Sequence, residues 1–247
     1  MARMRLDQWL EKAGRAQSRS RARDLIRRGF VTINGVVETK PARTVPNGAD
    51  VDVSEEAPGY VSRGAEKLAA ALDHFDFAPA GLAVLDAGAS TGGFTDLLLE
   101  RGAEKVIAVE KGSEQLHARV KSDPRVVSLE NTDIRDIKRD VMGDPIEAVV
   151  ADLSFISVTK ALGPALELCV PQAWAVVLIK PQFEVGPDGI GKGGIVRDEA
   201  RQIEAIDTVR RFVANLGGWT IEGIIRSPIL GGSGNAEFLL GARKTAS

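Results

Sequence analysis

The chain has 247 residues, of which 44% are hydrophobic and 27% charged, a composition typical of a folded globular protein. Its longest apolar-leaning run, residues 168–179, is shorter than the roughly 20 residues that a membrane-spanning helix needs. The charged first residues show no secretory signal, and the single cysteine, Cys169, excludes an intramolecular disulfide and a cysteine-cluster metal site. We therefore expect a cytoplasmic protein that has no membrane partner.

Positive charge is concentrated near the N-terminus. Residues 1–50 contain eleven Lys or Arg and five Asp or Glu, whereas residues 51–247 contain 21 and 29. A basic segment on an acidic body indicates a module that binds a polyanion.

The basic segment has the pattern of two helices followed by a hairpin. Apolar residues within 5–13 have helical spacing, and a second helix is expected from an N-cap at Ser18 to about residue 28. Asn34-Gly35, between two short β-type runs, predicts a type I′ turn.

Arginines form a ridge on the second predicted helix. Arg19, Arg23 and Arg27 repeat every four residues, and Asp24 is almost the only acid on this helix. Like charges at this spacing destabilise a helix unless something offsets them. Such long cationic side chains are typical of phosphate contacts, although a solvated helix face is the plainer alternative.

Residues 1–53 resemble an S4 RNA-binding domain. The resemblance rests on RLD, SRSRARDLIRRG and VTING, which occur in this order. It implies that the first two helices and the loop into the hairpin bind structured RNA. The RNA contacts expected from the resemblance and the charge pattern are Arg5, Arg19, Arg21, Arg23, Arg27, Arg28 and Arg63. Residues 54–60, polar and interrupted by Pro and Gly, are expected to form a linker.

Residues 61–247 have the pattern of a larger α/β domain. A helix is expected over 62–77 and another over 199–216, and two final runs, 219–225 and 236–242, leave no room for a helix between them. Five runs rich in Val, Ile and Ala are expected to be strands buried on both faces, at 82–90, 106–110, 126–130, 147–152 and 174–180. The pattern predicts a doubly wound, Rossmann-like parallel sheet with an antiparallel pair at its edge.

The first predicted strand runs into a glycine-rich turn, DAGASTGGF, at residues 86–94. Glycines allow a sharp turn and the close approach of a ligand. A carboxylate at this strand end, Asp86, would repel a pyrophosphate but can accept a hydrogen bond from an ammonium group, and Glu110 at the next strand end can accept from ribose hydroxyls. These features favour S-adenosylmethionine over a dinucleotide or a purely structural turn.

Two lysines and two acids are expected near the same edge of the sheet. Asp152 and Lys180 close the fourth and fifth predicted strands, and Glu237 opens the last one. Lys67 lies on the helix that precedes the first strand. Each has a structural explanation when taken singly, but together they form a set in which every charge can be paired.

The larger domain resembles the FtsJ-type ribose 2′-O-methyltransferases, and the whole chain resembles the TlyA family of ribosomal RNA methyltransferases. The motifs concerned are YVSRGAEKL, LDAGASTGGFTDLLLERGA, DLSFIS, LIKPQFE, GKGGIVRD and GGSGNAEFL. The resemblance implies a catalytic tetrad of Lys67, Asp152, Lys180 and Glu237. The S-adenosylmethionine contacts expected are Asp86, Gly88, Ala89, Ser90, Gly92, Gly93, Phe94, Glu110, Asp133 and Asp152.

The resemblance implies methylation of a ribose 2′-hydroxyl, at a cytidine, in ribosomal RNA or ribosomal subunits. No metal is expected, and the sequence assigns no oligomeric state. Lys180 could act as a neutral base or as a charged stabiliser of the developing alkoxide. Three alternatives remain: a membrane-active hemolysin, tested by liposome leakage; a non-catalytic RNA-binding protein, tested by methyl incorporation; and a nucleobase methylase, disfavoured because DLSF replaces an NPPY-like turn.

Overall fold

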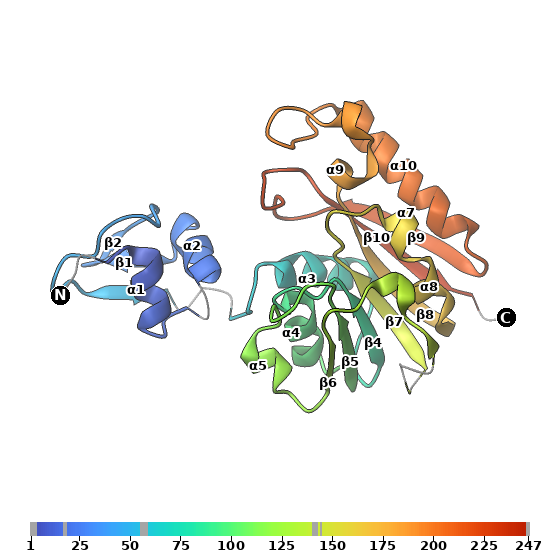
Figure 1. Ribbon diagram of the computed structural model, residues 1–247, viewed down its shortest axis with the longest axis horizontal. Helices are drawn as coiled ribbons and strands as arrows, with labels where there is room; N and C mark the ends of the chain where they lie inside the picture. Colours follow the sequence, from blue (N-terminus) through green and yellow to red (C-terminus); the bar gives the residue numbers. More distant parts are fainter. Residues whose placement is uncertain (1–3, 17–18, 55–58, 140–142, 144, 246–247) are drawn as a thin grey trace. The chain divides into compact units, whose positions relative to one another are not determined.

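The computed structural model of the protein describes residues 4–16, 19–54, 59–139, 143 and 145–245 (Figure 1). Contacts along the chain divide it into two units, Met1–Arg63 and Gly64–Ser247. Each unit has an apolar core of its own. Within the predicted linker, residues 55–58 lie outside the described residues, as does the predicted N-cap Ser18.

The N-terminal unit contains two helices and a three-stranded antiparallel sheet of order β2-β1-β3. Its elements are α1 (Leu6–Lys12), α2 (Arg19–Arg27), β1 (Val31–Ile33), β2 (Val36–Val37) and β3 (Val51–Val53). The predicted order of two helices and a hairpin is confirmed. Asn34 and Gly35 both have positive φ, as a type I′ turn requires. The strand β3, which pairs with β1, was not predicted, because a three-residue run carries little periodic signal.

The C-terminal unit is built on a seven-stranded sheet of order β6-β5-β4-β7-β8-β10-β9. Five strands are parallel, and β10 pairs antiparallel with β9, as the sequence predicted. β10 also runs antiparallel to β8. The strands are β4 (Ala83–Ala87), β5 (Lys105–Val109), β6 (Val126–Leu129), β7 (Ile146–Ala151), β8 (Cys169–Ile179), β9 (Trp219–Arg226) and β10 (Phe238–Lys244).

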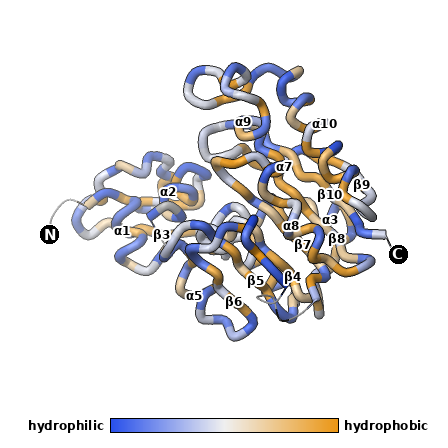
Figure 2. Tube along the Cα trace, turned by 45° about the vertical axis from the view of Figure 1, so that its right-hand side comes forward, coloured by the Kyte–Doolittle hydropathy of each residue, from blue (hydrophilic) through white to orange (hydrophobic). Residues whose placement is uncertain are grey.

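Helices cover both faces of this sheet. One face is covered by α3 (Gly64–Phe75) and α4 (Gly93–Glu100), and the other by α7 (Val158–Ala161), α8 (Gly163–Glu167) and α10 (Glu199–Asn215). The other helices among the described residues are short: α5 (Ala118–Lys121), α9 (Pro181–Glu184), and the 3₁₀ turns η1 (Ile134–Asp136) and η2 (Pro187–Gly189). Figure 2 shows the central strands as the most hydrophobic part of the unit, in keeping with burial between two helical layers.

Small residues let α3 pack closely on the antiparallel edge of the sheet. The Phe75 ring lies over Gly241 of β10, where an added Cβ would approach the ring to 2.6 Å. Phe77 continues this layer and stacks on Trp174 of β8, with ring centroids 5.1 Å apart. The close packing holds α3, and therefore Lys67, against the end of the sheet where β10 begins.

Register places the start of β10 beside the end of β8. Phe238 pairs with Ile179, so Glu237 and Lys180 leave the sheet as neighbours. The bounds differ slightly from expectation: Asp86 lies inside β4 and does not close it, while Asp152 and Lys180 follow the last residues of their strands. The helix expected over 62–77 is shorter at both ends, and Asp76 follows it with a positive φ.

Candidate active site

A cleft of about 500 Å³ opens at the carboxyl ends of the parallel strands. It is lined by the segments that follow β4, β5, β6 and β7, as is usual for ligand sites of doubly wound sheets. The lining is mixed: the polar side chains include Glu110, Asp133 and Asp152, and apolar side chains such as Ile134 and Leu153 lie between them. Such a surface suits a ligand with both an apolar ring and several hydroxyl or amine groups.

The turn after β4 is shaped for a close approach between backbones. Gly88 has φ +85°, and a Cβ there would lie 2.7 Å from the backbone oxygen of Asp152. Ser90 also has a positive φ, and its backbone N–H donates to the Glu110 carboxylate at 3.0 Å. Glu110 accepts a second hydrogen bond from the N–H of Gly112 at 2.7 Å. Glu110, which is expected to accept hydrogen bonds from ribose hydroxyls, therefore also stabilises the turns after β4 and β5.

Asp86 differs from its predicted place in the site. Its side chain is fully buried and is not part of the cleft lining. Oδ2 accepts a hydrogen bond from the Thr95 hydroxyl at 2.6 Å, and Oδ1 has no hydrogen-bond partner among the residues that the structure describes. Burial, together with the nearby carboxylates of Asp152 and Glu110, raises the pKa of Asp86 to about 7. The side chain of this strand residue is hydrogen-bonded to Thr95 of α4 and does not line the cleft, and its cofactor contact stays a prediction.

Lys180 and Asp152 form an ion pair at the side of the cleft. Lys180 Nζ lies 2.5 Å from Asp152 Oδ1 and donates to the Ser154 hydroxyl at 2.7 Å. Lys180 is largely buried, whereas Asp152 and Ser154 line the cleft. The Phe183 ring lies 5.9 Å from the ammonium group. A buried cation is thus held at the edge of the ligand space, with an acid and a hydroxyl as partners.

Lys67 and Glu237 form a second pair, which is buried more deeply. Lys67 Nζ donates to Glu237 Oε2 at 2.6 Å, and both side chains are almost inaccessible. Gly231 packs against this carboxylate so closely that a Cβ there would meet Glu237 Oε1. The four predicted catalytic residues are therefore arranged as two ion pairs, and strand register makes the pairs neighbours at one edge of the sheet.

In the N-terminal unit, Asp7 is buried and forms hydrogen bonds with three arginines. Its carboxylate accepts hydrogen bonds from Arg5, Arg19 and Arg23, at 3.1, 3.1 and 2.9 Å respectively. Burial opposes ionisation, but the hydrogen bonds from Arg5, Arg23 and Arg19 outweigh it and hold the pKa of Asp7 well below its usual range. The acid that offsets the arginine ridge thus comes from α1 and not from the helix that carries the ridge.

Asp24 forms ion pairs with three more of the arginines that were predicted to contact RNA. It pairs with Arg21 at 3.1 Å, with Arg28 at 3.7 Å and with Arg63 at 4.0 Å. The Arg21 side chain is buried against Asp24, so the RNA contact expected at this position stays a prediction that its burial does not favour. Arg27 is exposed, and no ion pair involving it is found among the described residues.

Two family models together match almost the whole chain. The FtsJ-like methyltransferase model matches residues 60–244, and the S4 domain model matches residues 4–51. The chain belongs to the FtsJ-like methyltransferase family. The residues that line the cleft and both ion pairs lie within the FtsJ-like match.

Similar proteins match this chain over nearly its full length. The chain is 44% identical to the Mycobacterium tuberculosis 16S/23S rRNA (cytidine-2′-O)-methyltransferase TlyA, over 98% of this chain and 90% of the relative. It is 40% identical to Hemolysin A of Brachyspira hyodysenteriae, over 96% and 98%. A solved Streptococcus thermophilus structure that carries a hemolysin name superposes with a TM-score of 0.78 at 36% identity, over 99% and 90%. Within the described residues, no helix is long and apolar enough to cross a membrane.

The predicted cofactor contacts of the FtsJ-like unit divide into two groups. Five line the cleft: Gly88, Ser90, Glu110, Asp133 and Asp152. Five do not line it, because they are buried in β4, in the turn after it or at the start of α4: Asp86, Ala89, Gly92, Gly93 and Phe94. The pKa of Asp133 is held below its usual range by hydrogen bonds from Arg135 and Lys111, so this cleft carboxylate is already paired.

Sequence reasoning missed an aromatic residue at the mouth of the FtsJ-like cleft. Phe155 lines the cleft, is 91% exposed and has φ +64°, a strained conformation for a bulky residue. Its ring lies 5.5 Å from that of Phe183. Glu184 supports the neighbouring turn by accepting from the Ser157 hydroxyl and the Val158 N–H. The motif DLSFIS contained this signal, since a phenylalanine between a strand-end acid and a helix N-cap has no obvious place in a core.

A second missed residue, Asn235, ties two glycine-rich segments together. Its side chain is buried, accepts from the N–H of Val196 at 2.9 Å and donates to the carbonyl of Gly194 at 2.8 Å. Asn235 lies two residues before Glu237, so it joins the segment GKGGIVRD by hydrogen bonds to the residues that lead into β10, which include this predicted catalytic acid.

Proposed function

We propose that this protein is an S-adenosylmethionine-dependent methyltransferase that modifies the 2′-hydroxyl of a cytidine ribose in ribosomal RNA. The observation that carries the proposal is the Lys180–Asp152 ion pair beside a glycine-bounded cleft at the carboxyl edge of the sheet. The relatives supply the rest of the proposal, since a protein 44% identical over almost the whole chain is named as a 16S/23S rRNA (cytidine-2′-O)-methyltransferase.

The cleft fits S-adenosylmethionine in its donor set and in its shape. Gly88 lets the turn after β4 lie against the Asp152 backbone, where a Cβ would collide, and both segments line the cleft. Glu110 and Asp133 place carboxylates where a ligand with hydroxyl and amine groups could be held. Ile134 and Leu153 supply an apolar surface for a purine ring. When bound, the cofactor would supply a methyl group that is already activated by its positive sulfur.

Lys180 is suited to stabilise negative charge on the attacking ribose oxygen. Its ion pair with Asp152 and its hydrogen bond to Ser154 fix the position of the Lys180 Nζ atom at the edge of the cleft. A preorganised cation beside a developing alkoxide stabilises the transition state more than the ground state. Both roles predicted for Lys180 use this position: a charged ammonium group would stabilise the alkoxide, and a neutral amine would accept the hydroxyl proton.

Features at the cleft mouth and in the N-terminal unit support an RNA substrate. An exposed aromatic ring such as that of Phe155 offers a stacking surface for an unpaired base. In the N-terminal unit, Arg19 and Arg23 each bind Asp7 through Nε, so their guanidinium planes are held in fixed directions. Guanidinium groups fixed in this way are well prepared to bind phosphates.

The test is methyl transfer from labelled S-adenosylmethionine to unmodified ribosomal RNA or subunits, followed by mapping of 2′-O-methyl sites. The wild-type chain should modify a ribose, whereas Gly88→Val should lose cofactor binding in a calorimetric titration. Lys138→Ala, which changes an exposed lysine outside the cleft, is the matched control and should behave as wild type. Transfer to a base, or liposome leakage without any transfer, would contradict the proposal.

A further inference from the structure

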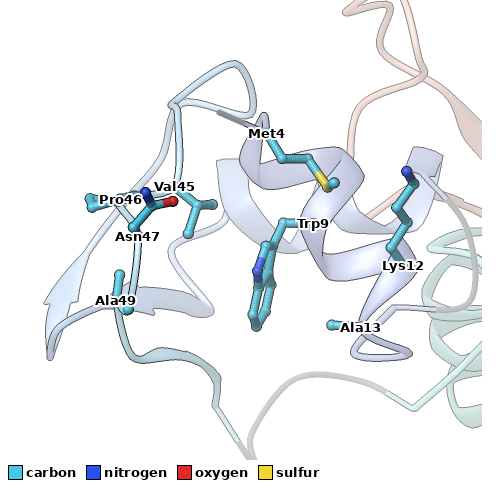
Figure 3. Close-up of a pocket in the computed structure, with 9 residues that line it drawn as sticks. Met4, Trp9, Lys12, Ala13, Val45, Pro46, Asn47 and Ala49 are labelled. Carbon is cyan, nitrogen blue, oxygen red and sulfur yellow. The ribbon is translucent and has the colours of Figure 1, made fainter. Parts of the chain in front are cut away.

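The N-terminal unit contains a pocket that the active site does not use (Figure 3). It has a volume of about 490 Å³ and lies between α1 and the loop formed by residues 45–49. The indole of Trp9 extends into the space between them, with Ala13 and Lys12 at the end of α1 on one side and Asn47 on the other. Trp9 is only partly buried, so it packs on the core of the unit and still offers surface to a ligand.

The chemistry of the lining favours a flat, polar-edged and anionic partner. The side chains of Trp9, Met4 and Val45 make much of it apolar, while Asn47 adds an amide that can both donate and accept hydrogen bonds. Lys12 is the one cation among the lining residues, and no carboxylate lines the pocket. An aromatic face, an amide and an ammonium group are the groups that bind the ring, the edge and the phosphate of a nucleotide.

We infer that this pocket takes one unpaired base of the RNA that the N-terminal unit binds. The inference rests on the proposed RNA substrate. Arg5 caps α1 one helical turn before Trp9, and its guanidinium belongs to the arginine cluster around Asp7. An RNA strand whose phosphates contact this cluster would lie within about one turn of α1 from the pocket. The N-terminal unit would then bind single-stranded or bulged RNA by inserting a base, in addition to binding phosphates.

A variant that fills the pocket without removing Trp9 tests the inference. Ala13 lines the pocket and is exposed, so Ala13→Phe in the full chain should occupy the base site and leave the core intact. We expect the affinity for unmodified ribosomal RNA to fall about 5- to 150-fold, which is the range for loss of one stacked base. Val36→Phe adds the same group at an exposed strand position elsewhere in the unit, and it should bind RNA as wild type does.

Photochemical cross-linking gives a second and independent readout. After ultraviolet irradiation of the full chain with extracted ribosomal RNA, the tryptic peptide Leu6–Lys12 should carry a nucleotide on Trp9. The adduct should disappear in Ala13→Phe, while cross-links to α2 remain.

The outcomes separate this inference from the proposed function. If wild type methylates ribosomal RNA but the Leu6–Lys12 peptide carries no adduct and Ala13→Phe binds RNA normally, the base pocket is wrong and the proposed function stands. If Ala13→Phe weakens binding to whole subunits but not to naked RNA, the occupant is a ribosomal protein and the inference is also overturned. If wild type neither binds nor methylates ribosomal RNA, both proposals fail.

Discussion

Two buried aspartates of this protein have opposite pKa shifts, and their partners explain the difference. Asp7 and Asp86 are equally inaccessible to solvent. Asp7 faces three guanidinium groups, so its charged form is favoured in spite of burial. Asp86 has one hydroxyl partner and two carboxylates nearby, so burial prevails and its neutral form is favoured up to about pH 7. Partners that the surrounding fold supplies therefore decide the charge of each residue.

The raised pKa of Asp86 predicts a specific pH dependence of stability. Because the folded-state pKa of about 7 lies above the unfolded value of 3.8, the unfolded chain releases this proton first as pH rises. The contribution of the neutral Asp86 side chain to the free energy of unfolding should be complete below about pH 4. It should be lost progressively as the pH rises to about 7. Asp86→Asn should therefore increase the free energy of unfolding relative to wild type at pH 8, by up to about 4 kcal/mol, with little difference at pH 4.

Urea unfolding of the two proteins at pH 4, 6 and 8 measures this effect. Asp136→Asn, at an exposed acid of the same unit, serves as the comparison and should leave the pH profile unchanged. If the free energy of unfolding changes with pH in the same way for Asp86→Asn and wild type, Asp86 is ionised throughout this pH range and the prediction is wrong.

The second prediction at this scale concerns Lys180. If its ammonium group acts mainly in the transition state, Lys180→Ala should lower single-turnover methyl transfer by about 10²- to 10⁴-fold. Binding of RNA and cofactor should change little. Lys180→Arg should not restore the rate, because the guanidinium is larger and planar and Asp152 and Ser154 already fix the space around Nζ. Loss of binding equal to the loss of rate would make Lys180 a positioning residue.

At the scale of elements, the active site depends on segments joined by few, specific hydrogen bonds. The segment 191–197 contains three glycines and a single bridge between Gly191 and Ile195. Asn235 holds it through two side-chain hydrogen bonds, and the same residue precedes β10, whose register sets the neighbouring positions of Glu237 and Lys180. One buried amide therefore couples a glycine-rich loop to the edge of the sheet.

Removal of this amide should loosen the loop. Asn235→Ala leaves the N–H of Val196 and the carbonyl of Gly194 without their partner, a loss worth about 1–3 kcal/mol for buried groups. Tryptic cleavage after Lys192 or Arg197 should then be at least several-fold faster than in wild type. Thr220→Ala, at an exposed position of β9, should be cleaved at the wild-type rate. Equal rates for all three proteins would show that Asn235 does not restrain the loop.

At the scale of the whole molecule, charge and chemistry are divided between two units. The basic residues 1–50 belong to the unit Met1–Arg63, while the cleft and both ion pairs belong to Gly64–Ser247. The arginines differ in their access to phosphates: Arg21 is buried in its pair with Asp24, whereas Arg19 and Arg23 stay partly exposed beside Asp7. The division implies that RNA affinity and cofactor affinity can be changed separately.

Arg27 offers a clean test of this division, because it is exposed and its removal leaves neither aspartate without a partner. Arg27→Ala should weaken binding to ribosomal RNA and reduce the slope of log affinity against log salt by about one unit. Affinity for S-adenosylmethionine should not change. Arg210→Ala, which removes an exposed arginine of α10, is the matched control. An unchanged salt slope for Arg27→Ala would exclude a phosphate contact at this position.

The sequence by itself determined the architecture, since periodicity and turn residues are local properties. The five buried runs, the antiparallel edge pair and the two helices with an Asn34-Gly35 hairpin all occur in the predicted order. The motifs also indicated which side chains would gather at the carboxyl edge, because consecutive parallel strands end on the same side of a sheet.

Only the tertiary structure decided which of those side chains are partners and which are accessible. Pairing of Lys67 with Glu237 joins residues 170 positions apart, and Asp7 meets Arg23 across two helices. The burial of Asp86 and Arg21 and the exposure of Phe155 also depend on packing between elements. No local pattern encodes such contacts, because they arise when the layers of the fold come together and exclude water from some polar groups and not from others.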